Sequence, residues 1–196
     1  MIRKRIPDKK YFKSTTTTKL RNEIVQILIT YNQPNYLEIG SCLGHTVFSV
    51  CEYTNKCTCI EINSNSVKTA MENLKKLQST YPDLTCLNNI EFITGTANDL
   101  PGEEYHVVFI DASHKYEDVK RDYNFVLSKN KLEKFDIIFH DYGLVDAGVK
   151  KFIHETFPIE KIIKIGEEDN WNPIGTSDVN DNEAVVITIR KGELQI

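Results

Sequence analysis

The stretch from Tyr36 to Thr46 constrains the fold of this chain more than any other. An apolar run, YLEI, leads into a loop punctuated by Gly40 and Gly44, and the residues after the loop favour a helix. Twenty-one residues after Gly40, a second apolar run ends on an acid, Glu61. In a βαβ unit such glycines let the backbone approach a ligand, the helix start offers free N–H groups, and the acid can accept ribose hydroxyls. The stretch therefore predicts an α/β fold that holds an adenosine-containing ligand.

Hydrophobic periodicity extends this pattern along the chain. A helix capped by Thr18 is expected first, and from Tyr36 onward apolar runs alternate with amphipathic segments. The runs at 106–111 and 136–140 are nearly unbroken, as in central parallel strands covered on both faces. The polar linker 166–182 leaves too little chain for a well-formed crossover helix, so the last two strands can pair antiparallel. Strands are predicted at 36–40, 57–61, 90–94, 106–111, 136–140, 159–165 and 184–190, helices at 18–31, 44–54, 64–80, 116–128 and 146–157, and a short turn or helical piece at 97–101.

Size and composition describe one ordinary globular domain. The chain has 196 residues and a formal net charge of −4. We expect a basic N-terminal arm over 1–15 and a single domain over 16–196. The mild acidity gives no reason to expect nucleic acid as a partner, and no apolar run reaches the length that spans a bilayer. Five cysteines without framework spacing, and no apolar segment behind the basic N-terminus, favour a reducing cytoplasm.

Polar residues close five of the predicted strands. Parallel pairing would bring these residues to one edge of the sheet, and ligands of open α/β sheets bind beyond the carboxyl ends of the strands. This shared placement predicts the site more firmly than any single motif. The residues are Glu38, Glu61, Thr96 with Ala97 and Asn98, Asp111 with His114, and His140 with Asp141.

Two motifs give the chain a resemblance to a known family. The loop from Glu38 to Gly44 reads E-x-G-x-x-x-G rather than the G-x-G-x-x-G of dinucleotide sites. It resembles motif I of the class I S-adenosylmethionine (SAM)-dependent methyltransferases. The segment from Asp111 to Asp122 resembles the D-x-x-H-x-Y signature of a small-molecule O-methyltransferase subgroup that includes macrocin-type, cephalosporin-hydroxylase-like and methyltransferase 24-like enzymes. The resemblance implies a Rossmann-like fold with a seven-stranded, mostly parallel sheet, an antiparallel last strand, and helices on both faces.

The resemblance also implies a cofactor, SAM, and the residues that hold it. Glu61 would accept the ribose hydroxyls, Glu38 would help to hold the amino-acid end, and Thr96 with Ala97 would contact the adenine ring. Alternatively, Glu38 stabilises the loop, and Thr96 and Ala97 belong to a plain turn. The predicted cofactor-binding set is Glu38, Gly40, Ser41, Gly44, Glu61, Thr96, Ala97 and Asp111.

A comparison with catechol-type methyltransferases implies the catalytic residues. Those enzymes bind Mg²⁺ with an acid after strand four and an acid–amide pair after strand five, and they carry a lysine base. The matching positions here are Asp111, the pair His140-Asp141, and His114. The predicted catalytic set is therefore His114, Asp111 and Asp141. His114 would be the base, because imidazole titrates near neutral pH.

A divalent cation at this place is an open question in the sequence. Asp111, Asp141 and His140 are the candidate ligands, but Mg²⁺ prefers oxygen, and one imidazole could favour Mn²⁺, Fe²⁺ or Zn²⁺. The third alternative is no metal. His114 could instead be a neighbour of a helix cap, and His140 a satisfied core histidine. Asp122 is expected to form a structural salt bridge.

The expected function is transfer of a methyl group from SAM to a hydroxyl of a small molecule, such as a sugar or a catechol-like ring. Two alternatives stay open: an NAD(P)- or nucleotide-sugar-binding oxidoreductase, and a non-catalytic partner protein with the same fold. A homodimer is also open, because the first helix has an apolar face that a second subunit could cover. In the linker 166–182, Trp171, Pro173 and Ile174 could cover the substrate.

Overall fold

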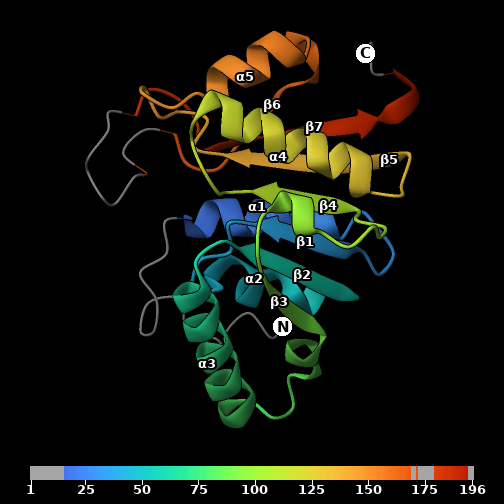
Figure 1. Ribbon diagram of the computed structural model, residues 1–196, viewed down its shortest axis with the longest axis vertical. Helices are drawn as coiled ribbons and strands as arrows, with labels where there is room; N and C mark the ends of the chain where they lie inside the picture. The colour runs from blue at the N-terminus through green and yellow to red at the C-terminus, as the bar shows by residue number, and fades with distance from the viewer. Residues whose placement is uncertain (1–15, 169–170, 172–178, 194–196) are drawn as a thin grey trace.

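A computed structural model describes residues 16–168, 171 and 179–193, which form one sheet flanked by helices (Figure 1). The seven strands of these residues are β1 (Asn35–Ile39), β2 (Lys56–Glu61), β3 (Ile90–Thr94), β4 (Val107–Ile110), β5 (Lys134–His140), β6 (Ile163–Ile165) and β7 (Ala184–Arg190). Their order is β3-β2-β1-β4-β5-β7-β6. β7 is antiparallel to β5 and β6, and the other neighbours are parallel. The predicted sheet is thereby confirmed.

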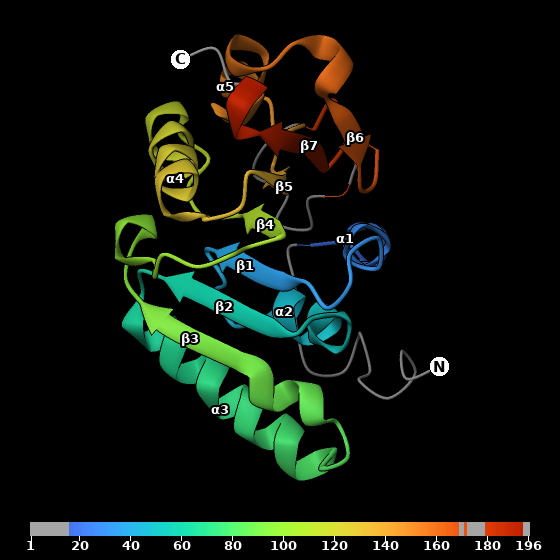
Figure 2. The ribbon, with the colours of Figure 1, turned by 90° about the vertical axis from the view of Figure 1, so that its right-hand side faces the viewer.

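Helices cover both faces of this sheet, as predicted. The α-helices of the described residues are α1 (Thr18–Leu28), α2 (His45–Val50), α3 (Ser64–Thr80), α4 (Tyr116–Lys129) and α5 (Val149–Thr156). α4 and α5 pack on one face, and α1, α2 and α3 pack on the other (Figure 2). None of these helices is long and apolar enough to cross a membrane.

β1 shows how one strand contributes side chains to two cores. Successive side chains of a strand point to opposite faces. Leu37 and Ile39 therefore pack with α4 and α5, whereas Tyr36 packs with α1 and α2. Tyr36 and Leu37 are completely buried, and each such side chain stabilises the fold by about 1.5–3 kcal/mol.

The order of the strands reverses at β1, which has β2 on one side and β4 on the other. At such a switch point the connecting chains leave in opposite directions, and a crevice opens beyond the carboxyl ends of the strands. The glycine-containing loop after β1 lies at this point.

Some predicted boundaries shift for local reasons. Thr17, not Thr18, caps α1, because the Thr17 hydroxyl accepts the Leu20 N–H at 3.1 Å. The helix predicted over 44–54 is divided into α2 and a 3₁₀ turn, η1 (Cys51–Tyr53). The helix predicted over 146–157 begins only at Val149, because the residues before it form a chain of turns.

The strand predicted over 159–165 shortens to β6, and its first half becomes a 3₁₀ turn, η4 (Ile159–Lys161). The carbonyl of Pro158 accepts the Lys161 N–H at 3.0 Å, which closes the turn. The piece predicted at 97–101 is a 3₁₀ turn as well, η3 (Ala97–Asp99).

Candidate functional site

A cavity of about 510 Å³ lies beyond the carboxyl ends of β1, β2, β3 and β4. This volume is typical of sites for small molecules and cofactors. Its wall includes five of the eight predicted cofactor residues, namely Gly40, Glu61, Thr96, Ala97 and Asp111. The other three, Glu38, Ser41 and Gly44, are not among the described residues that line it.

Glu61 holds the glycine loop while facing the cavity. Its Oε2 accepts the backbone N–H of Cys42 at 3.0 Å, and its Oε1 accepts that of Asn63 at 2.8 Å. Each carboxylate oxygen has two lone pairs, so both can accept a further hydrogen bond. The side chain is half-buried at the cavity wall, where ribose hydroxyls could reach it.

Gly40 is required by the way β1 meets β4. Its φ is +88°, and a Cβ atom placed on it would lie 2.3 Å from the carbonyl oxygen of Asp111. Any larger residue would force these two strand ends apart. Cys42 also has a positive φ, 46°, so the loop turns sharply around the cavity.

Glu38 lies beneath the site instead of on its surface. The side chain is 2% exposed, and the Tyr36 hydroxyl donates to its Oε2 at 3.2 Å. Burial, together with the nearby Asp111 carboxylate, raises the pKa of Glu38 well above its ordinary value. Its predicted contact with the amino-acid end of SAM stays a prediction.

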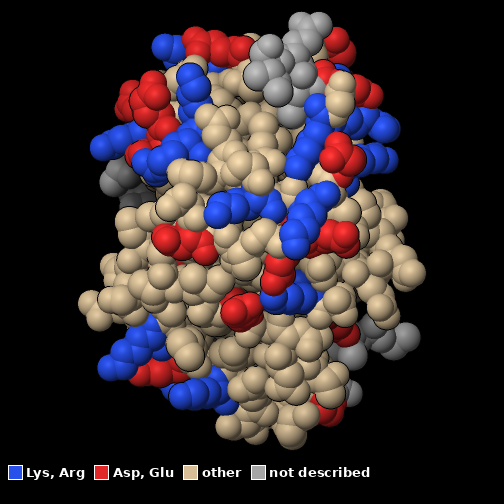
Figure 3. Space-filling view, turned by 45° about the vertical axis from the view of Figure 1, so that its right-hand side comes forward, with Lys and Arg blue, Asp and Glu red and all other residues tan. Residues whose placement is uncertain are grey.

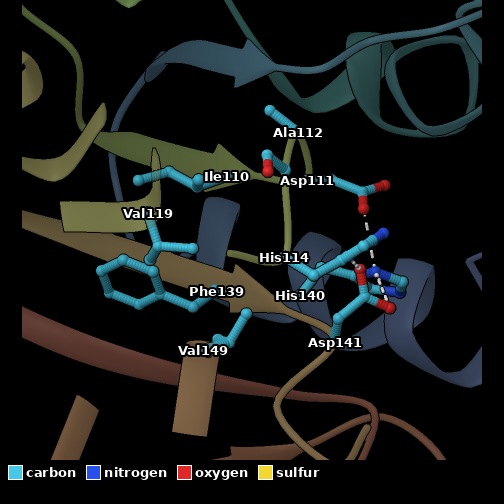
Figure 4. A pocket seen from close by; sticks show the side chains of 10 residues that line it. Ile110, Asp111, Ala112, His114, Val119, Phe139, His140, Asp141 and Val149 are labelled. Carbon is cyan, nitrogen blue, oxygen red and sulfur yellow. Dashed lines mark ion pairs between the residues drawn. The ribbon is translucent and has the colours of Figure 1, made fainter. Parts of the chain in front are cut away.

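Asp111, His140 and Asp141 converge where β4 and β5 end (Figure 4). One potential ligand atom of each lies within 4.8 Å of the other two. His140 Nδ1 is 2.9 Å from Asp111 Oδ1 and 3.1 Å from Asp141 Oδ1. Asp141 has a φ of 58°, a left-handed conformation that costs a non-glycine residue about 1–3 kcal/mol and is typical of functional sites.

Glu183, which sequence reasoning missed, contacts this cluster from the far side of His140. Its Oε1 lies 3.2 Å from His140 Nε2 and also accepts the Thr17 N–H at 2.8 Å. The Thr17 hydroxyl donates to Oε2, and Glu183 is completely buried. The only signal in the sequence is an acid directly before an apolar strand. This acid can be placed beside His140 only when the β5–β7 register, with His140 opposite Ala184, is known.

These contacts surround the ring of His140 with carboxylates. Nε2 lies 3.2 Å from Glu183 Oε1, and Nδ1 faces Asp111 and Asp141. Nδ1 is buried and forms no well-aligned hydrogen bond. Burial would lower the pKa of His140, but Asp111 and Asp141 outweigh it and raise the pKa well above its ordinary value. The cluster thus attracts positive charge to Nδ1.

His114 lies on the loop between β4 and α4, with its side chain 54% exposed. Its Nδ1 is 2.5 Å from Asp141 Oδ2, and this hydrogen bond raises the pKa of His114. Burial would raise the pKa of Asp141, but His140 and His114 lower it well below the usual range. Gly148 donates its N–H to the His114 carbonyl at 2.6 Å and fixes the loop to the start of α5. The three predicted catalytic residues therefore line one small pocket (Figure 4).

Other residues that the sequence singled out have packing or pairing roles. Asp122 is buried and pairs with Arg121 at 3.4 Å, as expected of a structural salt bridge. Trp171 is buried with its ring centroid 5.6 Å from that of His140, so the linker does contact the site. Pro173 and Ile174 lie outside the described residues.

Solved structures share this fold. A protein of Staphylococcus aureus to which caffeoyl-CoA O-methyltransferase activity has been attributed is 18% identical, with a TM-score of 0.59 over 87% of this chain and 82% of that one. An RNA methyltransferase from Salinibacter ruber, solved with S-adenosyl-L-homocysteine, is 14% identical, with a TM-score of 0.60 over 90% and 94%. This chain spans half the length of YcgJ from Bacillus subtilis, which is 20% identical with a TM-score of 0.50 over 61% of this chain. No curated protein matches the sequence.

The sequence itself matches a family described as "Methyltransferase domain" over residues 37–142, more than half of the chain. The matched region runs from β1 to the residues just after β5 and so contains the glycine loop, Glu61 and the cluster at Asp111. The predicted cofactor, SAM, is the methyl donor of this class. The chain belongs to the methyltransferase-domain family and has the class I, Rossmann-like fold.

Proposed function

We propose that this chain transfers a methyl group from SAM to a hydroxyl of a small molecule, with a divalent cation held by Asp111, His140 and Asp141. The observation that carries the proposal is the placement of these three side chains and His114 beside the cofactor cavity. Asp111 belongs to both places, since it lines the cavity and contacts His140.

The residues present fit a cation. His140 Nδ1 is an orphaned buried nitrogen between two carboxylates, and Glu183 fixes the ring by holding Nε2–H. Metal-ligating histidines commonly donate their other N–H to a carboxylate in this way. One imidazole with two carboxylates suits Mn²⁺ better than Mg²⁺, which prefers oxygen ligands alone. A bound cation would supply Lewis-acid polarisation of the acceptor hydroxyl.

His114 is the proposed base. Asp141 holds its Nδ1–H at 2.5 Å, so Nε2 is the atom left to accept the proton of the acceptor hydroxyl. The half-exposed ring can reach a substrate that enters from solvent. General bases of this kind contribute about 10²–10⁴-fold to a rate.

SAM is assigned to the 510 Å³ cavity. Glu61 would accept the two ribose hydroxyls, Thr96 and Ala97 would contact the adenine, and the glycine loop would face the amino-acid end. Positioning then provides most of the catalysis, because SAM already carries an electrophilic methyl group.

A small acceptor agrees with the charge of the protein. The net charge is −4, and Figure 3 shows acidic and basic side chains interspersed over one face instead of gathered into a basic surface. Proteins that bind nucleic acid commonly concentrate Lys and Arg on one face. The O-methyltransferase activity attributed to the Staphylococcus aureus neighbour is of the proposed kind, whereas the Salinibacter ruber neighbour acts on RNA.

Calorimetry with S-adenosylhomocysteine tests the cofactor assignment, with NADH as the control ligand. We expect binding of the former only; NADH binding alone would instead favour the oxidoreductase. Methyl transfer from labelled SAM to catechol, to sugar and to RNA acceptors, with Mn²⁺, Mg²⁺ or chelator, then tests the reaction. We expect a methylated hydroxyl on a small acceptor and loss of activity with chelator. Transfer to RNA alone would overturn the proposed acceptor class, and cofactor binding without any transfer would favour the non-catalytic alternative.

A further inference from the structure

Two cysteines lie side by side near the amino ends of β2 and β3, whereas the cofactor cavity lies at the carboxyl ends of these strands. Cys51 belongs to η1, after α2, and Cys86 belongs to η2 (Thr85–Asn89), before β3. Both 3₁₀ turns lie where β2 and β3 begin, whereas Glu61 and the cavity lie where these strands end. The two Sγ atoms are 3.6 Å apart, although 35 positions separate them in the sequence.

We propose that Cys51 and Cys86 form a reversible disulfide when the protein meets a hydroperoxide. A disulfide bond is about 2.05 Å long, so the sulfur atoms need to approach by about 1.5 Å. Both residues belong to short 3₁₀ turns outside the strands, so the approach requires movement of turn residues and not of a strand.

The two thiols have unequal access and acidity. Cys86 is half-buried, whereas Cys51 is 1% exposed. The Cys51 S–H donates to Cys86 Sγ, which lowers the pKa of Cys86 and raises that of Cys51. An accessible, more acidic thiol beside a second thiol is the arrangement of a peroxide-sensitive pair, in which the first thiol reacts and the second resolves.

The hydroperoxide is the oxidant of the two thiols. The Cys86 thiolate attacks the terminal peroxide oxygen, the O–O bond breaks, and a sulfenic acid forms as the alkoxide or hydroxide leaves. The Cys51 sulfur then attacks the Cys86 sulfur, the S–O bond breaks, and the hydroxyl leaves with the Cys51 proton as water. The two thiols lose two electrons in total, and the peroxide gains them.

The other cysteines are poorer candidates. Cys57 is completely buried, with its Sγ 3.0 Å from the Thr54 hydroxyl, and burial raises the pKa of Cys57 to about 12. Cys42 is an exposed residue on the glycine loop, at the carboxyl ends of the strands. Partial burial of its thiol and the nearby Glu61 carboxylate raise its pKa. Cys42 therefore serves as an internal control, because it shows how fast peroxide modifies a thiol that is exposed but has no second thiol beside it.

Peptide mapping of the peroxide-treated wild-type chain tests this proposal. After brief treatment with H₂O₂, alkylation and digestion without reductant, we expect the Cys51 and Cys86 peptides to be joined. Two of the five thiols should be lost before Cys42 is, and dithiothreitol should restore both. Cys86→Ser should abolish the link, whereas the matched variant Cys57→Ser should keep it.

Two results would overturn the proposal. One is full alkylation of Cys51 and Cys86 at a peroxide concentration that already modifies Cys42. The other is a link from either cysteine to a different one, such as Cys57. Both are read on the wild-type chain, so the test stands even if a variant fails to fold. Neither result bears on methyl transfer, because the pair lies away from the cofactor cavity.

Discussion

Replacement of Glu61 by alanine should weaken cofactor binding by about 30- to 1,000-fold. Each hydrogen bond from a ribose hydroxyl to a carboxylate is worth about 1.5–3 kcal/mol. Two such bonds would give about 3–6 kcal/mol, but Glu61 is half-buried, so water replaces part of the loss. A net cost of about 2–4 kcal/mol corresponds to the stated change in Kd, since 1.4 kcal/mol is tenfold.

The same substitution also loosens the loop. Without the carboxylate, the N–H groups of Cys42 and Asn63 lose their acceptors, at 3.0 Å and 2.8 Å. Both groups are near solvent and can turn to water, so we expect this part to cost no more than about 1 kcal/mol. The effect should therefore appear mainly in the affinity, with little change in the melting temperature.

Isothermal titration with S-adenosylhomocysteine, beside a thermal melt of the same samples, measures both effects. Glu72→Ala is the matched control, because Glu72 lies on the exposed side of α3 away from the cavity. Equal affinity of wild type and Glu61→Ala, with the control unchanged, would refute the assignment of Glu61 to the ribose and of this cavity to SAM.

Three further outcomes are expected. His114→Ala should lower turnover by about 10²–10⁴-fold while S-adenosylhomocysteine affinity, read by titration, stays within twofold; a large loss of affinity would contradict its role as base. Glu183→Gln should weaken Mn²⁺ binding by about 10–100-fold in calorimetry, and unchanged affinity would remove His140 from the ligand set. Burial would raise the pKa of Asp181, but hydrogen bonds from Lys164 and Lys150 lower it to about 2. Asp181→Asn should therefore lower the free energy of unfolding, measured in urea at pH 7, by about 1–2 kcal/mol after allowance for solvent screening. The difference between wild type and variant should shrink as the pH falls from about 4 to about 2. A difference that stays constant over this range would contradict the pairing.

Much of the fold follows from the sequence because period-2 and period-3.6 patterns report burial directly. β4 is the clearest example, since a nearly unbroken apolar run predicts a strand buried on both faces, and Val108 and Phe109 are so buried. Boundaries depend on single hydrogen bonds that the pattern does not contain. Thr17 and Thr18 are chemically equal candidates for a cap, and only the bond to Leu20 separates them.

The candidate site likewise has a part that the sequence predicts and a part that it does not. Residues at the ends of parallel strands could be placed together from the sequence, because parallel register brings these ends to one edge. Glu38 is different, because an acid near the end of a strand can face either the ligand or the core. Its position in register with Phe109 and Cys59, inside the sheet, turns it toward Tyr36. That choice depends on the pleat, which a single residue does not reveal.

The antiparallel strand explains why Glu183 and Trp171 meet His140. β6 runs toward the edge of the sheet that carries the site, and β7 starts from that edge. The described residues that follow β6 and precede β7 therefore lie at the end of the sheet that carries the site. Glu183, the last residue before β7, then lies beside the end of β5 and contacts His140, and its second oxygen holds Thr17 at the start of α1. One buried carboxyl group thus connects the proposed metal ligand to the linker and to the first helix, so substitution of Glu183 should alter the site and the N-terminal region together.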